Sequence, residues 1–317
     1  MASDTIDISG GKHGRVIVTA LLALAVFAVP TVASATQLYW GLAAGGNISQ
    51  NITVVSRSND RASLCDEYIN PRALTVPGCT TPNRGYGDGW QAQFDRGSGF
   101  SAEVELGLRL SSRFRFAVLY AHSSTRFDQT VSSSDATGVD FDKISNELSI
   151  GQETLGTVRS DELFVMGYHD WPNQSRWTPY VGIGVGLARS RMDFSWLWVR
   201  STNPQNIAVG IGQPNAAPIR RNLAGTVSTG RAKLRDTLTG YALVLGAERR
   251  LSETFSVGLK VQWKHFEAFR SGAYQGDLLR SHVPNLRLDG SEPVSTRSRT
   301  DDTSRFSALI TIRYAIP

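Results

Sequence analysis

The chain has 317 residues and a net charge of +5, with 33 Lys and Arg against 28 Asp and Glu. Charged residues make up 19% of it and form no dense basic block, which excludes nucleic acid as an expected partner. No uninterrupted apolar run of membrane-spanning length follows the first 35 residues, so a helical membrane protein with several spans is excluded as well.

The amino-terminal segment has the pattern of an export signal. Lys12 and Arg15 precede an apolar stretch at 16–29, which ends at Pro30 and leads into the small residues of 33–35. This order predicts a secretory signal peptide at 1–35 and a mature domain at 36–317. A membrane anchor is the alternative, but about 14 apolar residues are few for a span.

Export to an oxidising compartment affects what the two cysteines are expected to form. Cys65 and Cys79 lie in one irregular segment and, in an oxidising compartment, are expected to form a disulfide. Closing a loop of about 15 residues would stabilise the chain by roughly 3 kcal/mol. Free or metal-binding thiols are the alternative, although no His lies nearby to complete a zinc site.

Alternation of apolar and polar residues predicts strands along the mature chain. In the clearest example, 100–110, every even position is apolar and every odd position is polar or glycine. The segment 161–171 is apolar on both parities, so its faces stay unassigned. The predicted strands, eight in number, are 38–44, 100–110, 114–120, 161–171, 177–188, 241–246, 255–264 and 305–316.

Short and long connections alternate between these strands. Tight turns are expected near 111–112, 172–174 and 251–253, and long connections at 50–98, 126–160, 195–236 and 268–303. Loops this long are uncommon in compact domains. In an up-and-down barrel the alternation places all long loops at one rim, as in bacterial outer-membrane barrels with short periplasmic turns and long extracellular loops.

The two faces of the strands favour a membrane barrel over a soluble one of the lipocalin type. The polar face is rich in glycine, which suits a narrow interior but would weaken strands that faced water. Aromatic residues gather in two bands, as two membrane interfaces require. The turn-side band holds Trp40, Phe114, Phe116, Trp171, Trp177, Phe255 and Tyr314, and the loop-side band holds Phe100, Tyr120, Tyr241, Trp263 and Phe306. We therefore expect an all-β, eight-stranded antiparallel up-and-down transmembrane β-barrel with four long extracellular loops, located in the bacterial outer membrane.

Two segments carry a family resemblance. The stretch 179–186, PYVGIGVG, follows Asp170 and Trp171, and the opening 39–45 reads YWGLAAG. Both resemble strand motifs of the outer-membrane β-barrel family that includes the OmpA transmembrane domain and the opacity-type surface proteins. The resemblance implies outer-membrane lipid and the barrel assembly machinery as partners and no cofactor. Members commonly end on an aromatic residue, whereas this chain ends Tyr314-Ala315-Ile316-Pro317.

Charged residues recur on the parity expected to face the lumen. Because an eight-stranded barrel is about filled by its side chains, these charges are expected to pair as a closed plug. The alternative is a small-solute diffusion porin, in which the excess of bases would favour anions. The expected lumen network is Glu103, Glu105, Arg109, Arg115, Glu248, Lys260, Lys264, Arg305 and Arg313.

Two residue patterns are similar to chemical sites, and for each a non-catalytic, metal-free interpretation is expected. His122 and Ser124 resemble part of the lipid A deacylase catalytic set, but the sequence places no carboxylate beside them to orient the histidine. Asp135, Asp140 and Asp142 are expected to be solvated acids and not a Ca²⁺ site. No enzyme activity, metal or cofactor is predicted.

The second and third long loops carry opposite charge. Between 126 and 161 there are seven acids and three bases, and between 195 and 236 six bases and one acid. One hypothesis is that these loops fold over each other and that Arg220, Arg221 and Arg231 reach lipopolysaccharide phosphates; two unrelated solvated loops are the alternative. The predicted function is a structural or surface-interaction role through the loops toward an extracellular ligand or host surface, with a diffusion porin or, less favoured, a lipid A-modifying enzyme as alternatives.

Overall fold

The computed structural model describes most of the chain after residue 36. The predicted signal peptide, 1–35, and the acids Asp140 and Asp142 lie outside the described residues, and so does the side chain of Asp135. The described residues are 37–59, 65–67, 69–81, 84, 89–127, 133–135, 147–208, 212, 215–273 and 295–317.

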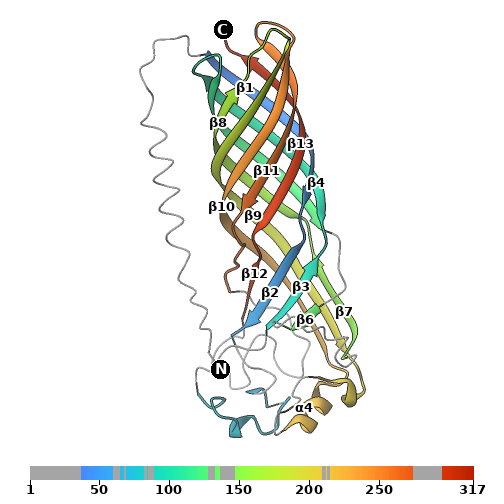
Figure 1. Ribbon diagram of the computed structural model, residues 1–317. Helices are drawn as coiled ribbons and strands as arrows, with labels where there is room; N and C mark the ends of the chain where they lie inside the picture. Colours follow the sequence, from blue (N-terminus) through green and yellow to red (C-terminus); the bar gives the residue numbers. More distant parts are fainter. Residues whose placement is uncertain are drawn as a thin grey trace.

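The predicted eight-stranded antiparallel barrel is confirmed. Each strand pairs with the next in the chain, the first pairs with the last, and the β9–β10 pairing completes the ring. In Figure 1 the short turns and the carboxyl terminus are at the top, and the long connections are at the bottom. The barrel strands are β1 (Gln37–Ser49), β4 (Gly97–Arg109), β5 (Phe114–Phe127), β8 (Val158–Asp170), β9 (Trp177–Arg200), β10 (Val227–Arg250), β11 (Phe255–Phe266) and β13 (Thr303–Ala315).

Apolar side chains cover the outside of the barrel half that carries the short turns. On β4 the even residues Val104 and Leu106 are more than half exposed, whereas the odd residues Glu103 and Glu105 are buried. At ~3.3 Å per residue and a tilt of ~40°, the outward apolar run 177–187 of β9 spans about 25 Å, the height of the apolar band of an outer-membrane barrel. This band is the face of a protein surrounded by lipid.

Strand β8, whose faces the sequence left open, points its larger side chains inward against glycines of β9. Tyr168, Met166 and Phe164 lie opposite Gly182, Gly184 and Gly186 in the register. A Cβ atom at Gly184 would lie 2.2 Å from the Met166 Sδ atom and 2.7 Å from the Val165 carbonyl oxygen. The glycines of this strand therefore leave room for the side chains that fill the lumen.

The long connections are more regular than predicted. Strands β9 and β10 are 24 residues each and continue well beyond the membrane band, so both ends of the predicted third loop, 195–200 and 227–236, are strand. A second sheet lies at the same end, in the order β12-β2-β3-β6. The remaining strands are β2 (Ile52–Ser58), β3 (Gly89–Phe94), β6 (Ser133–Asp135), β7 (Leu148–Leu155), which pairs with β9, and β12 (Thr296–Thr300).

The polarity of β9 reverses where the strand leaves the membrane band. From Val181 to Leu187 the outward residues are apolar, but beyond Ala188 the apolar residues Met192, Phe194 and Trp196 point inward. Outside a lipid phase the surroundings are water, so the apolar face must turn to a protein core. The reversal places the edge of the membrane band near Ala188 on β9.

The inward faces of β9 and the second sheet form one aromatic core. The Trp90 ring centroid lies 5.5 Å from that of Trp196 and 5.1 Å from that of Trp198. Phe94 packs edge-on against Phe194 at 6.5 Å. We call this assembly of β2, β3, β6 and β12 with the projecting parts of β7, β9 and β10 the extracellular sandwich (Figure 1).

The tip of the sandwich joins the first and third long connections. The predicted disulfide between Cys65 and Cys79 is confirmed, with 5.1 Å between the Cα atoms. The Asn222 Nδ2 atom, on helix α4 (Ala216–Leu223), donates to the Ile69 carbonyl oxygen at 2.9 Å. The apolar contact between the two connections is made by Ile69, Ile207, Ile219 and Leu223, and the short helices η1 (Ala73–Thr75) and η2 (Pro204–Asn206) flank it.

Candidate functional site

The barrel lumen holds two neighbouring groups of buried charge. In the group toward the sandwich, the Lys264 Nζ atom donates to Glu103 at 3.0 Å and to Glu162 at 2.8 Å. Lys260 also pairs with Glu103, and Arg305 pairs with Glu162. All five side chains are buried, so each charge has its counter-charge inside the barrel.

The second group, toward the short turns, is built around Arg115. Its guanidinium donates to Asp170 at 2.7 Å and lies 4.9 Å from the ring centroids of both Tyr168 and Tyr180. Glu105 accepts hydrogen bonds from the hydroxyls of Tyr39, at 2.9 Å, and Tyr168, at 2.5 Å.

Arg313 links the two carboxylates of this second group. It pairs with Glu248 and, at 3.5 Å, with Glu105. Aromatic faces and phenol donors add to the stabilisation of these buried charges, since a cation over a ring and a charge-assisted hydrogen bond are both favourable in a dry interior.

The residues proposed from sequence for the lumen all come from strands that point them inward. The structure adds two carboxylates that the sequence did not assign, Glu162 and Asp170, because the parity of β8 was ambiguous. With them, five acids face the five bases of the two groups, so the predicted excess of bases is wrong for the buried network. Arg109 is half-buried and forms no ion pair with a described residue.

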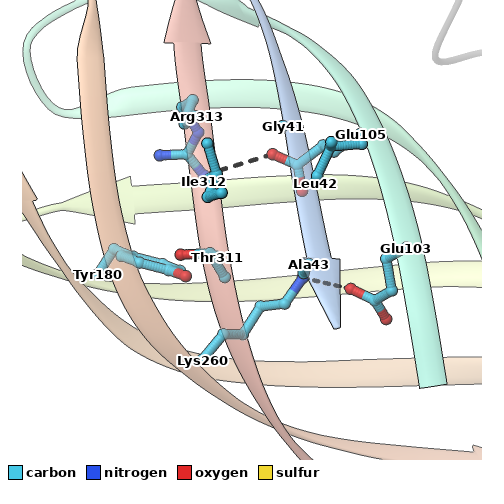
Figure 2. A pocket seen from close by; sticks show the side chains of 10 residues that line it. All are labelled: Gly41, Leu42, Ala43, Glu103, Glu105, Tyr180, Lys260, Thr311, Ile312 and Arg313. Carbon is cyan, nitrogen blue, oxygen red and sulfur yellow. Dashed lines mark hydrogen bonds and ion pairs between the residues drawn. The ribbon is translucent and has the colours of Figure 1, made fainter. Parts of the chain in front are cut away.

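A small polar pocket lies between the two groups (Figure 2). Lys260 and Glu103 border it on one side, and Glu105 and Arg313 on the other. The cavity has a volume of about 20 Å³, close to that of one water molecule. Such a space is too small to carry a solute past the ion pairs.

Apolar side chains close the lumen again beyond the charged groups. The Phe164 and Phe266 rings pack edge-on at 6.1 Å between centroids, and the Lys264 Nζ atom lies 5.1 Å from the centroid of Phe164. These rings belong to the same buried cluster as Phe194 and Trp196 of the extracellular sandwich. The described interior is therefore blocked first by ion pairs and then by an aromatic core.

His122 and Ser124 lie outside the barrel, at the loop-side edge of the membrane band. The structure supplies the carboxylate that the sequence could not place, since the His122 Nδ1 atom lies 2.8 Å from the Asp161 Oδ1 atom. Asp161 also accepts hydrogen bonds from Tyr120 at 3.1 Å and Arg191 at 2.8 Å. No hydrogen bond joins Ser124 to His122.

The arginines proposed for lipopolysaccharide lie apart from one another. Arg220 is on α4, and its guanidinium donates to the carbonyl oxygens of Pro204, at 3.0 Å, and Gln205. Arg221 is exposed on the same helix, whereas Arg231 is on the outward face of β10.

The second and third long connections do meet. β7 pairs with β9, and the Arg200 Nε atom donates to Glu147 at 3.0 Å. Among the described residues, this contact is a hydrogen-bond ladder with an ion pair between Arg200 and Glu147.

Comparison with known proteins gives distant likenesses only. No family model matches the chain, and no curated protein matches it. Among the described residues, no helix has both the length and the apolar character needed to cross a membrane.

Three solved structures illustrate the likeness of fold. Neisserial surface protein A is 12% identical with a TM-score of 0.30, covering 86% of this chain and 97% of its own. OprG from Pseudomonas aeruginosa is 10% identical with a TM-score of 0.41, covering 87% and 95%. The outer-membrane protease OmpT from Escherichia coli is 9% identical with a TM-score of 0.28, covering 88% and 97%. These likenesses are too distant to assign a role.

Proposed function

We propose that the protein is a closed outer-membrane barrel that displays the extracellular sandwich for surface interactions, and not a diffusion porin or an enzyme. The observation that carries this proposal is the double closure of the lumen. Ten buried charged side chains neutralise one another, and the aromatic core lies directly beyond them. Among the described residues, the part that faces away from the membrane is then the sandwich and its disulfide-linked tip.

The proposal includes a route of export and insertion for the chain. Residues 1–35 act as a signal peptide that is removed on export, and 36–317 insert through the barrel assembly machinery. The partner of the sandwich is an extracellular ligand or host surface, and the partner of the apolar band is outer-membrane lipid.

Electrical recording tests the closed lumen. Purified protein in planar bilayers is expected to give no current steps, because the ion pairs and the aromatic core leave no continuous aqueous path. A general diffusion porin reconstituted in parallel confirms that the bilayers report conduction. Reproducible steps from the purified protein would establish the porin alternative.

The enzyme alternative is favoured by one observation, the contact between His122 and Asp161. A nucleophile must also reach its base, and Ser124 does not. We therefore expect mass spectra of lipid A from cells producing the wild type to equal those from cells producing Ser124→Ala. Loss of an acyl chain that depends on both Ser124 and His122 would contradict this expectation.

A further inference from the structure

Basic side chains gather on the outward face of three neighbouring strands just beyond the apolar band. We call them the basic stripe, and all six are exposed. Two acids, Asp161 and Asp193, share this face. The basic stripe is Arg159 on β8, Arg189 and Arg191 on β9, and Arg231, Lys233 and Arg235 on β10.

Three of these arginines stand side by side. Arg159 is the register partner of Arg191, and Arg191 is the register partner of Arg235. Directly opposed residues bring their Cβ atoms to ~5 Å, and like charges at that spacing destabilise a sheet. Arg191 is paired with Asp161 at 2.8 Å, but Arg159 and Arg235 form no hydrogen bond or ion pair with any described residue. Lys233 is the register partner of Asp193, so this face supplies two acids for six bases, and Arg159 and Arg235 are left without a counter-charge from the described residues.

The depth of the stripe indicates where that counter-charge comes from. Leu163 and Leu187, opposite each other in the register, are the last apolar pair of the band on these strands. Arg159 is four residues beyond Leu163, which is ~13 Å along the strand and about 10 Å in height for a tilt of ~40°. The headgroup layer adds roughly 5–8 Å outside each face of the hydrocarbon core. Arg189, two residues beyond Leu187 and so about 5 Å above it, lies within this layer. Arg159 lies just beyond the outer edge of the layer.

We propose that the basic stripe binds the phosphate groups of an outer-leaflet phosphorylated glycolipid of the lipopolysaccharide class, whose acyl chains lie on the apolar band below it. Planar guanidinium groups bind phosphate oxygens in a bidentate manner. Continuity between the stripe and the apolar band selects a lipid over a free anion. The proposal depends on the barrel's orientation and not on the display role. It keeps Arg231 of the predicted lipopolysaccharide contact and replaces Arg220 and Arg221 of α4 with basic residues of the barrel wall.

A double variant, Arg159→Gln with Arg235→Gln, tests this site while keeping the pair between Arg191 and Asp161. The probes are purified rough lipopolysaccharide, the same lipid after dephosphorylation, and inorganic phosphate, each added to the whole barrel in detergent at low salt. Wild-type protein is expected to bind the phosphorylated lipid at least ~10-fold more tightly than the dephosphorylated one, a factor equal to about 1.4 kcal/mol. The double variant is expected to lose most of that difference.

The temperature of thermal unfolding distinguishes lipid binding by Arg159 and Arg235 from a structural role of these arginines. Without lipid, the double variant should unfold at the same temperature as the wild type or higher, because like charges have been removed. With phosphorylated lipid, the wild type should gain more than the variant. The matched control, Arg113→Gln with Arg249→Gln, removes two exposed arginines at the turn-side rim and should behave as the wild type.

Three results would overturn the proposal. One is equal affinity of the double variant and the wild type for phosphorylated lipid. Another is full competition by inorganic phosphate at comparable concentration, which would indicate a free-anion site. The third is an equal loss in the turn-side control, which would indicate a general effect of net charge.

Discussion

Arg115→Ala is expected to lower the free energy of unfolding by about 3–5 kcal/mol, because it leaves Asp170 charged and buried without its cation and leaves Glu248 with Arg313 alone. The measurement is urea unfolding of the barrel in lipid vesicles, followed by tryptophan fluorescence. Arg115 is only 1% exposed, so water cannot replace the lost guanidinium without entering the lumen.

Two further variants separate charge from packing in this experiment. Arg115→Met keeps most of the side-chain volume and should lose nearly as much stability as Arg115→Ala if the ion pair is the cause. Arg113→Ala removes an exposed arginine two residues away and should change stability by no more than about 0.5 kcal/mol. A loss below about 1 kcal/mol for both Arg115 variants would show that the lumen network is not a linked set of ion pairs.

Leu106→Arg is expected to cost about 2–4 kcal/mol in vesicles, because the new charge lies near the middle of the apolar band. Ser98→Arg is the matched control on the same strand, since Ser98 is exposed beyond the band and the cost there falls to about 0–1 kcal/mol. Val185→Arg on β9 should resemble Leu106→Arg. Equal tolerance at Leu106 and Ser98 would indicate a barrel surrounded by water.

The barrel itself could be predicted because lipid imposes a simple rule on the sequence. Every second residue of 100–110 must be apolar on the outside, while the inside accepts glycine and paired charge, so the parity of β4 is legible without a structure. The alternation of short and long connections then gives the topology. The disulfide could be predicted because two nearby cysteines in an exported chain usually oxidise to a disulfide.

The extracellular sandwich was harder to predict because the rule inverts outside the membrane. Up to Leu187 the outward apolar residues of β9 are at odd positions, whereas Met192, Phe194 and Trp196 are at even positions. A pattern that requires apolar residues on one face of the strand therefore ends near 188. Arg231 was assigned to a loop for the same reason.

Glu162 escaped prediction for a different reason. On β8 both parities carry apolar residues, since Leu163 faces lipid and Phe164 fills the lumen. The glycine opposite Phe164 on β9 shows that this face of β8 points into the lumen, but only the strand register places the two residues together. Long-range pairing, and not local pattern, therefore decided which carboxylates joined the buried network.

The hairpin of β9 and β10 crosses from membrane to exterior without a hinge. Its hydrogen-bonded register runs unbroken from the pair of Arg249 and Trp177 at the turn side to the pair of Val227 and Val199 near the tip. A load on the tip is thus carried by continuous β ladders into the barrel wall, which the surrounding lipid holds upright. The sandwich therefore keeps one fixed angle to the barrel axis, and under the proposed display role a partner would meet the same face of every copy.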